Sequence, residues 1–92
     1  MRQTDNEGRG KAKVWLKTKR NEAGLTQREL SRLIGIEYYT MISQIEAGKA
    51  RVPPDRYADY ARALKMDPQD FMKELLRYYD PEAWKILFGS RP

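Results

Sequence analysis

Two pairs of aspartates are the residues whose spacing could support carboxylate chemistry. Asp55 and Asp59 are four residues apart, and Asp67 and Asp70 are three apart. Clustered carboxylates can bind divalent metal ions and so support hydrolysis. The first pair, however, lies in a segment predicted to be a proline-started helix, and the second lies at a helix N-terminus, where capping and the helix dipole account for acidic side chains. We therefore expect that the protein is not an enzyme.

The residue types that most catalytic and metal sites require are missing from the sequence. The chain of 92 residues contains no cysteine and no histidine. Disulfides, thiol nucleophiles and zinc sites built on thiolate or imidazole are therefore excluded, as is a histidine-based catalytic triad. We expect no cofactor and no metal. The lack of cysteine fits a reducing compartment, and we expect the protein to be cytoplasmic.

Membrane insertion and secretion are not expected either. No apolar run approaches the ~20 residues that a transmembrane helix needs. The N-terminal segment MRQTDNEGRGK has no apolar stretch behind its charges and is not a secretory signal. We therefore expect no membrane partner.

Positive charge is concentrated in the N-terminal half of the chain. The net charge is +5. Residues 1–25 carry seven Lys or Arg against three Asp or Glu, residues 26–52 carry four against three, and residues 53–92 carry seven against seven. A basic N-terminal half and a neutral C-terminal half indicate a polyanionic partner that contacts the N-terminal half. Charge alone leaves open the alternative that the lysines only solvate a helix.

Helical periodicity, capping residues and prolines divide the chain. Residues 1–10 are polar and contain glycine, and we expect a disordered basic arm there. Thr26 with Glu29 three residues later is a capping-box signature. Asp67 and Asp80 each precede a proline, which combines an N-cap with a first-turn proline. The sequence predicts helices at 11–23, 26–34, 38–46, 55–65, 68–79 and 81–88.

The segment GIEYYTMISQIEAG, residues 35–48, contains β-branched and aromatic residues that favour a strand. Its apolar residues do not alternate, as they would in a half-buried strand. Ile42 and Ile45 are three residues apart, which is helical spacing. Gly48 follows at the position where a glycine commonly ends a helix. We therefore predict a helix over 38–46.

Several short motifs follow one another in the N-terminal two thirds of the chain. They are R-x-x-x-G-L-T-Q from Arg20 to Gln27, E-L-S-x-L-I-G-I, I-S-Q-I-E-x-G from Ile42 to Gly48 and, more loosely, ALKMDPQDF at 63–71. Through these motifs, residues 16–48 closely resemble the XRE family of phage-repressor-like (Cro/C1-type) DNA-binding proteins. The resemblance implies an all-α, lambda-repressor-like DNA-binding domain of five to six helices with a C-terminal helical extension. The implied division is a helix-turn-helix DNA-binding domain over 11–66 and C-terminal helices over 67–92.

The resemblance also implies a role for each helix of the motif. The helix at 26–34 should lie across the DNA backbone, and the helix at 38–46 should enter the major groove. Gln44 is the best candidate for reading a base, because an amide side chain can bond adenine N6 and N7 together. Arg20 and Glu46 match an ion pair between the first and third helices. Base contacts are expected from Tyr39, Thr40, Ser43 and Gln44, and DNA-backbone contacts from Lys17, Thr18, Gln27, Arg28, Tyr38, Met41, Lys49 and Arg51.

The sequence departs from the family pattern at the turn before the third helix. Between Gly35 and Gly48 it is one residue longer than the commonest spacing, so Glu37 or a tyrosine must cap the helix in place of the usual serine or threonine. We expect Tyr38 to pack against the altered turn and Tyr39 to face the DNA. For both tyrosines, the opposite assignment stays open.

The C-terminal segment FMKELLRYYDPEAWKILFG has more apolar surface than a small core obviously needs. It either completes the core or forms a dimer interface, for which the candidate contacts are Trp84, Leu87, Phe88 and Tyr79.

We therefore expect a sequence-specific transcriptional regulator that binds double-stranded DNA as a homodimeric repressor. The alternative is an antitoxin-like or other protein-interaction module, in which a protein partner occupies the C-terminal surface and DNA binding is secondary.

Overall fold

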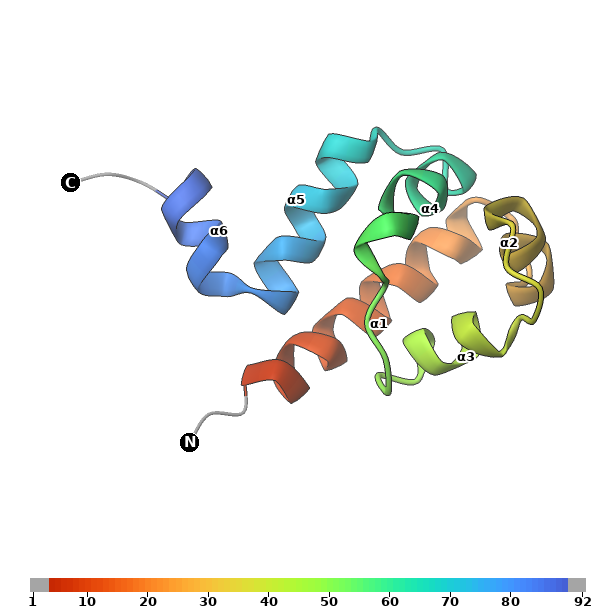
Figure 1. Ribbon diagram of the computed structural model, residues 1–92, viewed down its shortest axis with the longest axis horizontal. Coiled ribbons are helices and arrows are strands. Elements are labelled where there is room, and N and C mark those ends of the chain that lie inside the picture. The colour runs from red at the N-terminus through yellow and green to blue at the C-terminus, as the bar shows by residue number, and fades with distance from the viewer. Residues whose placement is uncertain (1–3, 90–92) are drawn as a thin grey trace.

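Every regular element in the part of the chain that the structure describes is a helix. The computed structural model describes residues 4–89. Figure 1 shows α1 to α5 gathered into one cluster, from which α6 projects at one end. The all-helical prediction is confirmed. The elements are α1 (Thr4–Glu22), α2 (Gln27–Ile34), α3 (Thr40–Glu46), the short 3₁₀ helix η1 (Pro54–Arg56), α4 (Tyr57–Ala63), α5 (Pro68–Tyr79) and α6 (Pro81–Phe88).

Two helix N-termini form as their sequence signals predict, and a third does not. The Thr26 hydroxyl accepts a hydrogen bond from the Glu29 N–H while the Glu29 carboxylate accepts one from the Thr26 N–H, which completes the capping box. Asp67 caps α5 by accepting bonds from the backbone N–H groups of residues 69 and 70. Asp80 makes no side-chain cap bond to α6. Its carboxylate instead lies 3.7 Å from the Arg51 guanidinium.

The core combines residues from α1 to α5. Leu16, Leu30, Ile42 and Phe71, one from each of α1, α2, α3 and α5, are fully buried. Phe71 stacks on Tyr60 of α4, with ring centroids 5.5 Å apart. Burial of such side chains stabilises each by about 1.5–3 kcal/mol relative to exposure. The core therefore fixes α3 against α1 and α2.

The N-terminal part of α1 corrects the prediction of a disordered arm over residues 1–10. Residues 4–10 are helical, and residues 1–3 lie outside the described part of the chain. Gly8 is buried against α5, so close that an added Cβ would collide with the Tyr78 carbonyl oxygen. The Arg9 guanidinium donates a hydrogen bond to the Lys49 carbonyl over 3.3 Å. Tertiary packing therefore stabilises turns whose polar, glycine-containing sequence favours disorder.

The two C-terminal helices have different roles in the fold. α5 completes the core through Phe71, Leu75 and Tyr79, whereas α6 packs on α5 and buries no residue. Tyr79 is only 4% exposed, and its hydroxyl accepts a hydrogen bond from the Val52 N–H. Its expected place in a dimer interface is therefore wrong, because the side chain is already enclosed by its own chain.

Substitution of the two glycines of α1 should separate close packing from helix propensity. Gly8→Ala should destabilise the protein by about 1–3 kcal/mol, because the new methyl group would collide with the backbone of Tyr78. Gly10 has no neighbour within 4 Å of an added Cβ. Gly10→Ala should therefore stabilise the protein by about 0.5–1 kcal/mol. Urea denaturation of both variants measures the difference, and equal stabilities would contradict the packing of α1 on α5.

Candidate nucleic-acid interface

A buried ion pair joins the ends of α1 and α3. The Arg20 guanidinium donates two hydrogen bonds to the Glu46 carboxylate, from Nε over 2.7 Å and from Nη2 over 2.9 Å. The two side chains are only 10% and 3% exposed. The hydrogen bond to Glu46 raises the pKa of Arg20, while burial opposes that rise. This is the ion pair that the sequence led us to expect.

Two further bonds extend the ion pair into a network. Arg20 Nη1 donates to the Leu25 carbonyl over 2.8 Å, and Gln27 Nε2 donates to Glu46 Oε1 over 3.1 Å. The network therefore ties α1, the turn after it, the first residue of α2 and the end of α3 together. Gln27 was expected to direct its side chain at a DNA phosphate. In this structure the amide donates to Glu46, and its contact with a phosphate stays a prediction.

The outer face of α3 carries polar side chains. Ile42 and Ile45 are buried, whereas Thr40 and Gln44 are exposed and Ser43 is half-buried. Four-residue spacing places Thr40 and Gln44 one above the other on this face. Met41 is half-buried and packs against the core. Its expected contact with the DNA backbone is therefore not supported.

Both tyrosines of the turn are exposed, so the prediction that Tyr38 packs against the turn is wrong. α3 begins at Thr40, so both tyrosines precede it. Tyr39 occupies the N-cap position without a side-chain cap bond, and the Arg28 guanidinium lies 4.5 Å from its ring centroid. Tyr38 is 67% exposed. Tyr39 is 37% exposed and contacts Arg28 of α2 through a surface cation–π interaction, and Tyr38 is the more exposed of the two rings.

Arg51 is directed away from α3. Its guanidinium donates a hydrogen bond to the Tyr79 carbonyl over 2.7 Å and lies 4.7 Å from the Tyr79 ring centroid. It also faces Asp80. The predicted role of Arg51 at the DNA backbone is therefore wrong in this structure, because the end of α5 engages the side chain.

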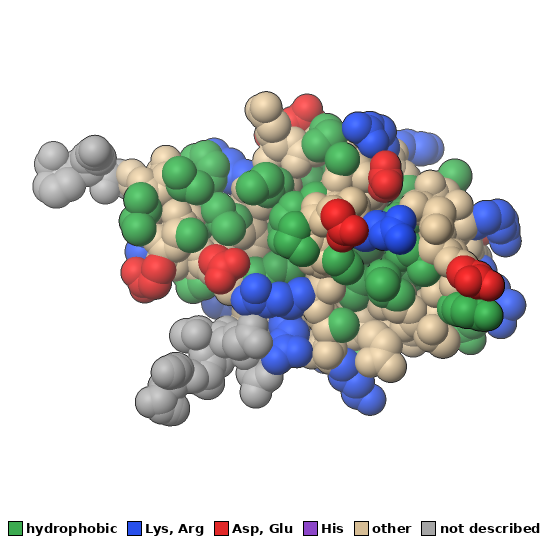
Figure 2. Space-filling view, viewed as in Figure 1, with side chains coloured by type: hydrophobic (Ala, Val, Ile, Leu, Met, Phe, Trp, Pro, Cys, Tyr) green, Lys and Arg blue, Asp and Glu red, His purple; other side chains and the backbone are tan. Residues whose placement is uncertain are grey.

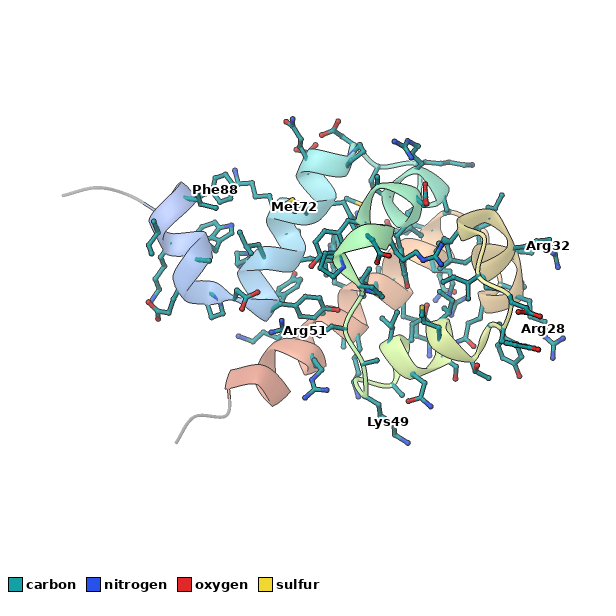
Figure 3. All side chains as sticks on the ribbon, viewed as in Figure 1. Arg28, Arg32, Lys49, Arg51, Met72 and Phe88 are labelled. Atoms are coloured by element: carbon teal, nitrogen blue, oxygen red, sulfur yellow. The ribbon has the colours of Figure 1, made fainter. Side chains whose placement is uncertain are left out.

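Basic side chains flank the outer face of α3. Arg28 and Arg32 extend from α2 on one side, and Lys49 extends from the loop after α3 on the other (Figure 3). In the same view, lysines and arginines gather along the lower and right-hand edges of the molecule (Figure 2). Lys17 is exposed on α1, and Thr18 beside it donates its hydroxyl to the Val14 carbonyl over 2.8 Å.

Sequence reasoning missed two basic residues on α1. Arg9 and Lys13 precede Lys17 at four-residue steps, so the three lie along one face of the helix. The Lys13 side chain passes beside Gly48, whose added Cβ would lie 3.2 Å from the lysine Cδ. The face therefore continues the basic surface from Lys49 along α1. The four-residue spacing of these basic residues in the sequence could have predicted this face.

One aspartate of each pair has a structural partner. Asp59 accepts a hydrogen bond from Arg62 over 3.1 Å, and Asp67 caps α5. Among the side chains that the structure describes, which begin at residue 8, no group of three or more His, Cys, Asp or Glu could hold a metal ion. No helix within residues 4–89 is long and apolar enough to cross a membrane.

Comparisons with known proteins locate the motif in the chain. A family model described as helix-turn-helix matches residues 16–71, from the middle of α1 to the first turn of α5. Searches of curated proteins and of solved structures found no match. The matched segment includes the Arg20–Glu46 network and the whole of α2 and α3.

Glu46→Gln should destabilise the protein on the order of 3–5 kcal/mol, because it leaves the buried Arg20 charge without a counterion. Glu82→Gln is the matched control, since it removes the carboxylate of an exposed pair with Lys85 and should cost less than ~1 kcal/mol. Thermal and urea denaturation measure both effects. A Glu46→Gln protein as stable as the control would show that the buried pair contributes nothing to stability.

Proposed function

Because the chain belongs to the Cro/C1-type (XRE) helix-turn-helix family of DNA-binding regulators, we propose that it is a sequence-specific repressor of transcription that binds double-stranded DNA as a homodimer. The fold is all-helical and lambda-repressor-like. In this proposal residues 11–66 form the DNA-binding unit and residues 67–92 supply packing and dimerisation. We expect the protein in the cytoplasm, together with its DNA, and we expect no catalytic activity.

The observation that carries the proposal is the outer face of α3. Thr40 and Gln44 are exposed on a short helix that the core and the Arg20–Glu46 network hold in place. A major groove about 12 Å wide admits one α-helix. Basic side chains lie on both sides of this face, where the two phosphate backbones of a groove would run. Polar groups that can read bases are thus combined with charges that can hold phosphates.

Gln44 is the residue that we assign to base recognition. Its amide can donate to and accept from one adenine edge, and α3 holds it outward. Thr40 can contact a thymine methyl group, and the half-buried Ser43 can bond to either kind of base. Tyr38, exposed in the turn before α3, can offer its hydroxyl to a phosphate or a base, whereas Tyr39 contributes mainly through its contact with Arg28.

Contacts with the DNA backbone are assigned to the flanking cations. Lys49, Lys17 and Arg28 keep the roles expected from the sequence, and Lys13 and Arg9 join them through the face of α1. The N-terminus of α2 adds backbone N–H groups and the positive end of a helix dipole. Such contacts supply affinity that falls steeply with salt and carry little sequence information.

A protein-interaction module remains the second candidate function. The observation that favours it is α6, an apolar helix that buries no residue in its own chain. In that case an antitoxin-like role with secondary DNA binding would be expected. A gel shift against genomic fragments, with excess nonspecific competitor DNA, separates the two. A band that survives competitor at moderate salt supports the repressor, and its absence would favour the second candidate.

Gln44→Ala should weaken binding to the specific site by roughly 1–3 kcal/mol and leave nonspecific binding nearly unchanged, because only a base contact is lost. Titration of the selected site and of a scrambled duplex by fluorescence anisotropy measures both affinities. An equal loss on the two duplexes would show that Gln44 contacts the backbone.

Lys49→Ala and Lys13→Ala should each weaken all duplexes alike, and each should reduce the slope of log K against log salt by about one. Arg62→Ala is the control, because Arg62 lies on α4 and pairs with Asp59. Anisotropy titrations at several salt concentrations provide the slopes. Slopes equal to that of the control would remove these lysines from the interface.

A further inference from the structure

The loop after α3 is held by side chains of α1 and α5. It covers residues 47–53 and carries Lys49, the cation that flanks the outer face of α3 on this side (Figure 3). The Val52 N–H donates a hydrogen bond to the Tyr79 hydroxyl over 3.2 Å. The Arg9 guanidinium donates one to the Lys49 carbonyl over 3.3 Å. The backbone of the loop is therefore fixed at two points by contacts from outside it.

Arg51 joins the loop to the same residue of α5. Its guanidinium donates a hydrogen bond to the Tyr79 carbonyl over 2.7 Å and lies 4.7 Å from the centroid of the Tyr79 ring. Lys49 leaves the loop in a different direction and is exposed (Figure 3). Tyr79 is thus contacted at its hydroxyl, its ring and its carbonyl by one short segment. Because its side chain is only 4% exposed, the packed core fixes the position that it gives the loop.

Neither of the two anchors belongs to the helix-turn-helix motif. The family model matches residues 16–71, whereas Arg9 precedes that segment and Tyr79 follows it. The first turns of α1 and the last turns of α5 also pack on each other, where Gly8 meets the Tyr78 backbone. Two segments that lie outside the motif therefore meet behind the loop and fix it.

We propose that Tyr79 is a positioning residue for DNA binding, which holds the loop after α3 so that Lys49 is presented to the phosphate backbone. Arg9 holds the same loop from α1, and Arg51 acts through Tyr79 without touching DNA itself. The physical gain is preorganisation, because a loop that is already ordered loses less conformational entropy on binding. The inference rests on the proposed function, which assigns Lys49 to the DNA backbone.

A double-mutant cycle between Tyr79 and Lys49 in the full chain tests the proposal. Burial raises the pKa of the Tyr79 hydroxyl, so Tyr79→Phe removes a hydrogen-bond acceptor and no charge at neutral pH. Binding to a nonspecific duplex is measured by fluorescence anisotropy. In the wild-type background Lys49→Ala should weaken binding roughly three- to tenfold, through loss of one phosphate contact. In the Tyr79→Phe background it should cost less than about twofold, because the lysine is no longer held at the phosphate.

Tyr78→Phe is the matched control, because the Tyr78 hydroxyl donates to Glu74 of the same helix. In this background Lys49→Ala should keep its full cost. Circular dichroism and urea denaturation identify conditions in which every variant is folded, so a loss of stability alone would not produce this pattern. Amide hydrogen exchange at Val52, measured by NMR without DNA, should be faster in Tyr79→Phe than in Tyr78→Phe.

The possible failures of the two proposals are distinguishable. An equal cost of Lys49→Ala in all three backgrounds would overturn the positioning role and leave the proposed function standing. Exchange at Val52 that is equally slow in Tyr79→Phe and Tyr78→Phe would also overturn it, since the loop would then not depend on the hydroxyl. A wild-type protein that binds no duplex at low salt would contradict the proposed function itself, and with it any role of Tyr79 at DNA.

Discussion

The bond between Arg20 and Glu46 is the constraint on which the rest of the structure depends. It fixes the end of α3 to the end of α1, and Gln27 adds the start of α2 to the same carboxylate. The pair is buried, so its geometry is scarcely weakened by solvent or salt. A seven-residue helix such as α3 has little stability of its own. Its direction is therefore set from both sides, by this network and by the core beneath it.

Local signals in the sequence predicted the helices well. The capping box at Thr26 and the cap at Asp67 formed, and helical spacing in 38–46 correctly outweighed strand propensity. The Arg20–Glu46 pair was predicted from the family resemblance. No local pattern indicates that two side chains 26 residues apart in the sequence will meet. What could be predicted was thus either local or already encoded in a known pattern.

The errors have a common physical cause, which is competition from distant parts of the chain. From the sequence, Arg51 was expected at the DNA backbone. In the structure its guanidinium contacts the carbonyl and the ring of Tyr79, 28 residues away at the end of α5. The exposed Tyr39 ring lies against Arg28 of α2, across the turn. The first turns of α1 pack on α5, where Gly8 lies too close to the Tyr78 backbone for any residue with a Cβ. This packing stabilises the helix there. None of these contacts has a signal in the adjacent sequence.

In the proposed homodimer, the close packing of α1 would have a consequence for the spacing of DNA half-sites. The same turns contact α5 at Tyr78 and the loop after α3 at Lys49, so α1 acts as a strut between the two ends of the molecule. In a dimer formed through α5 and α6, the distance between the two copies of α3 would be set by this strut and not by a flexible linker. Such a protein would tolerate base changes between its half-sites far better than the insertion of a single base pair.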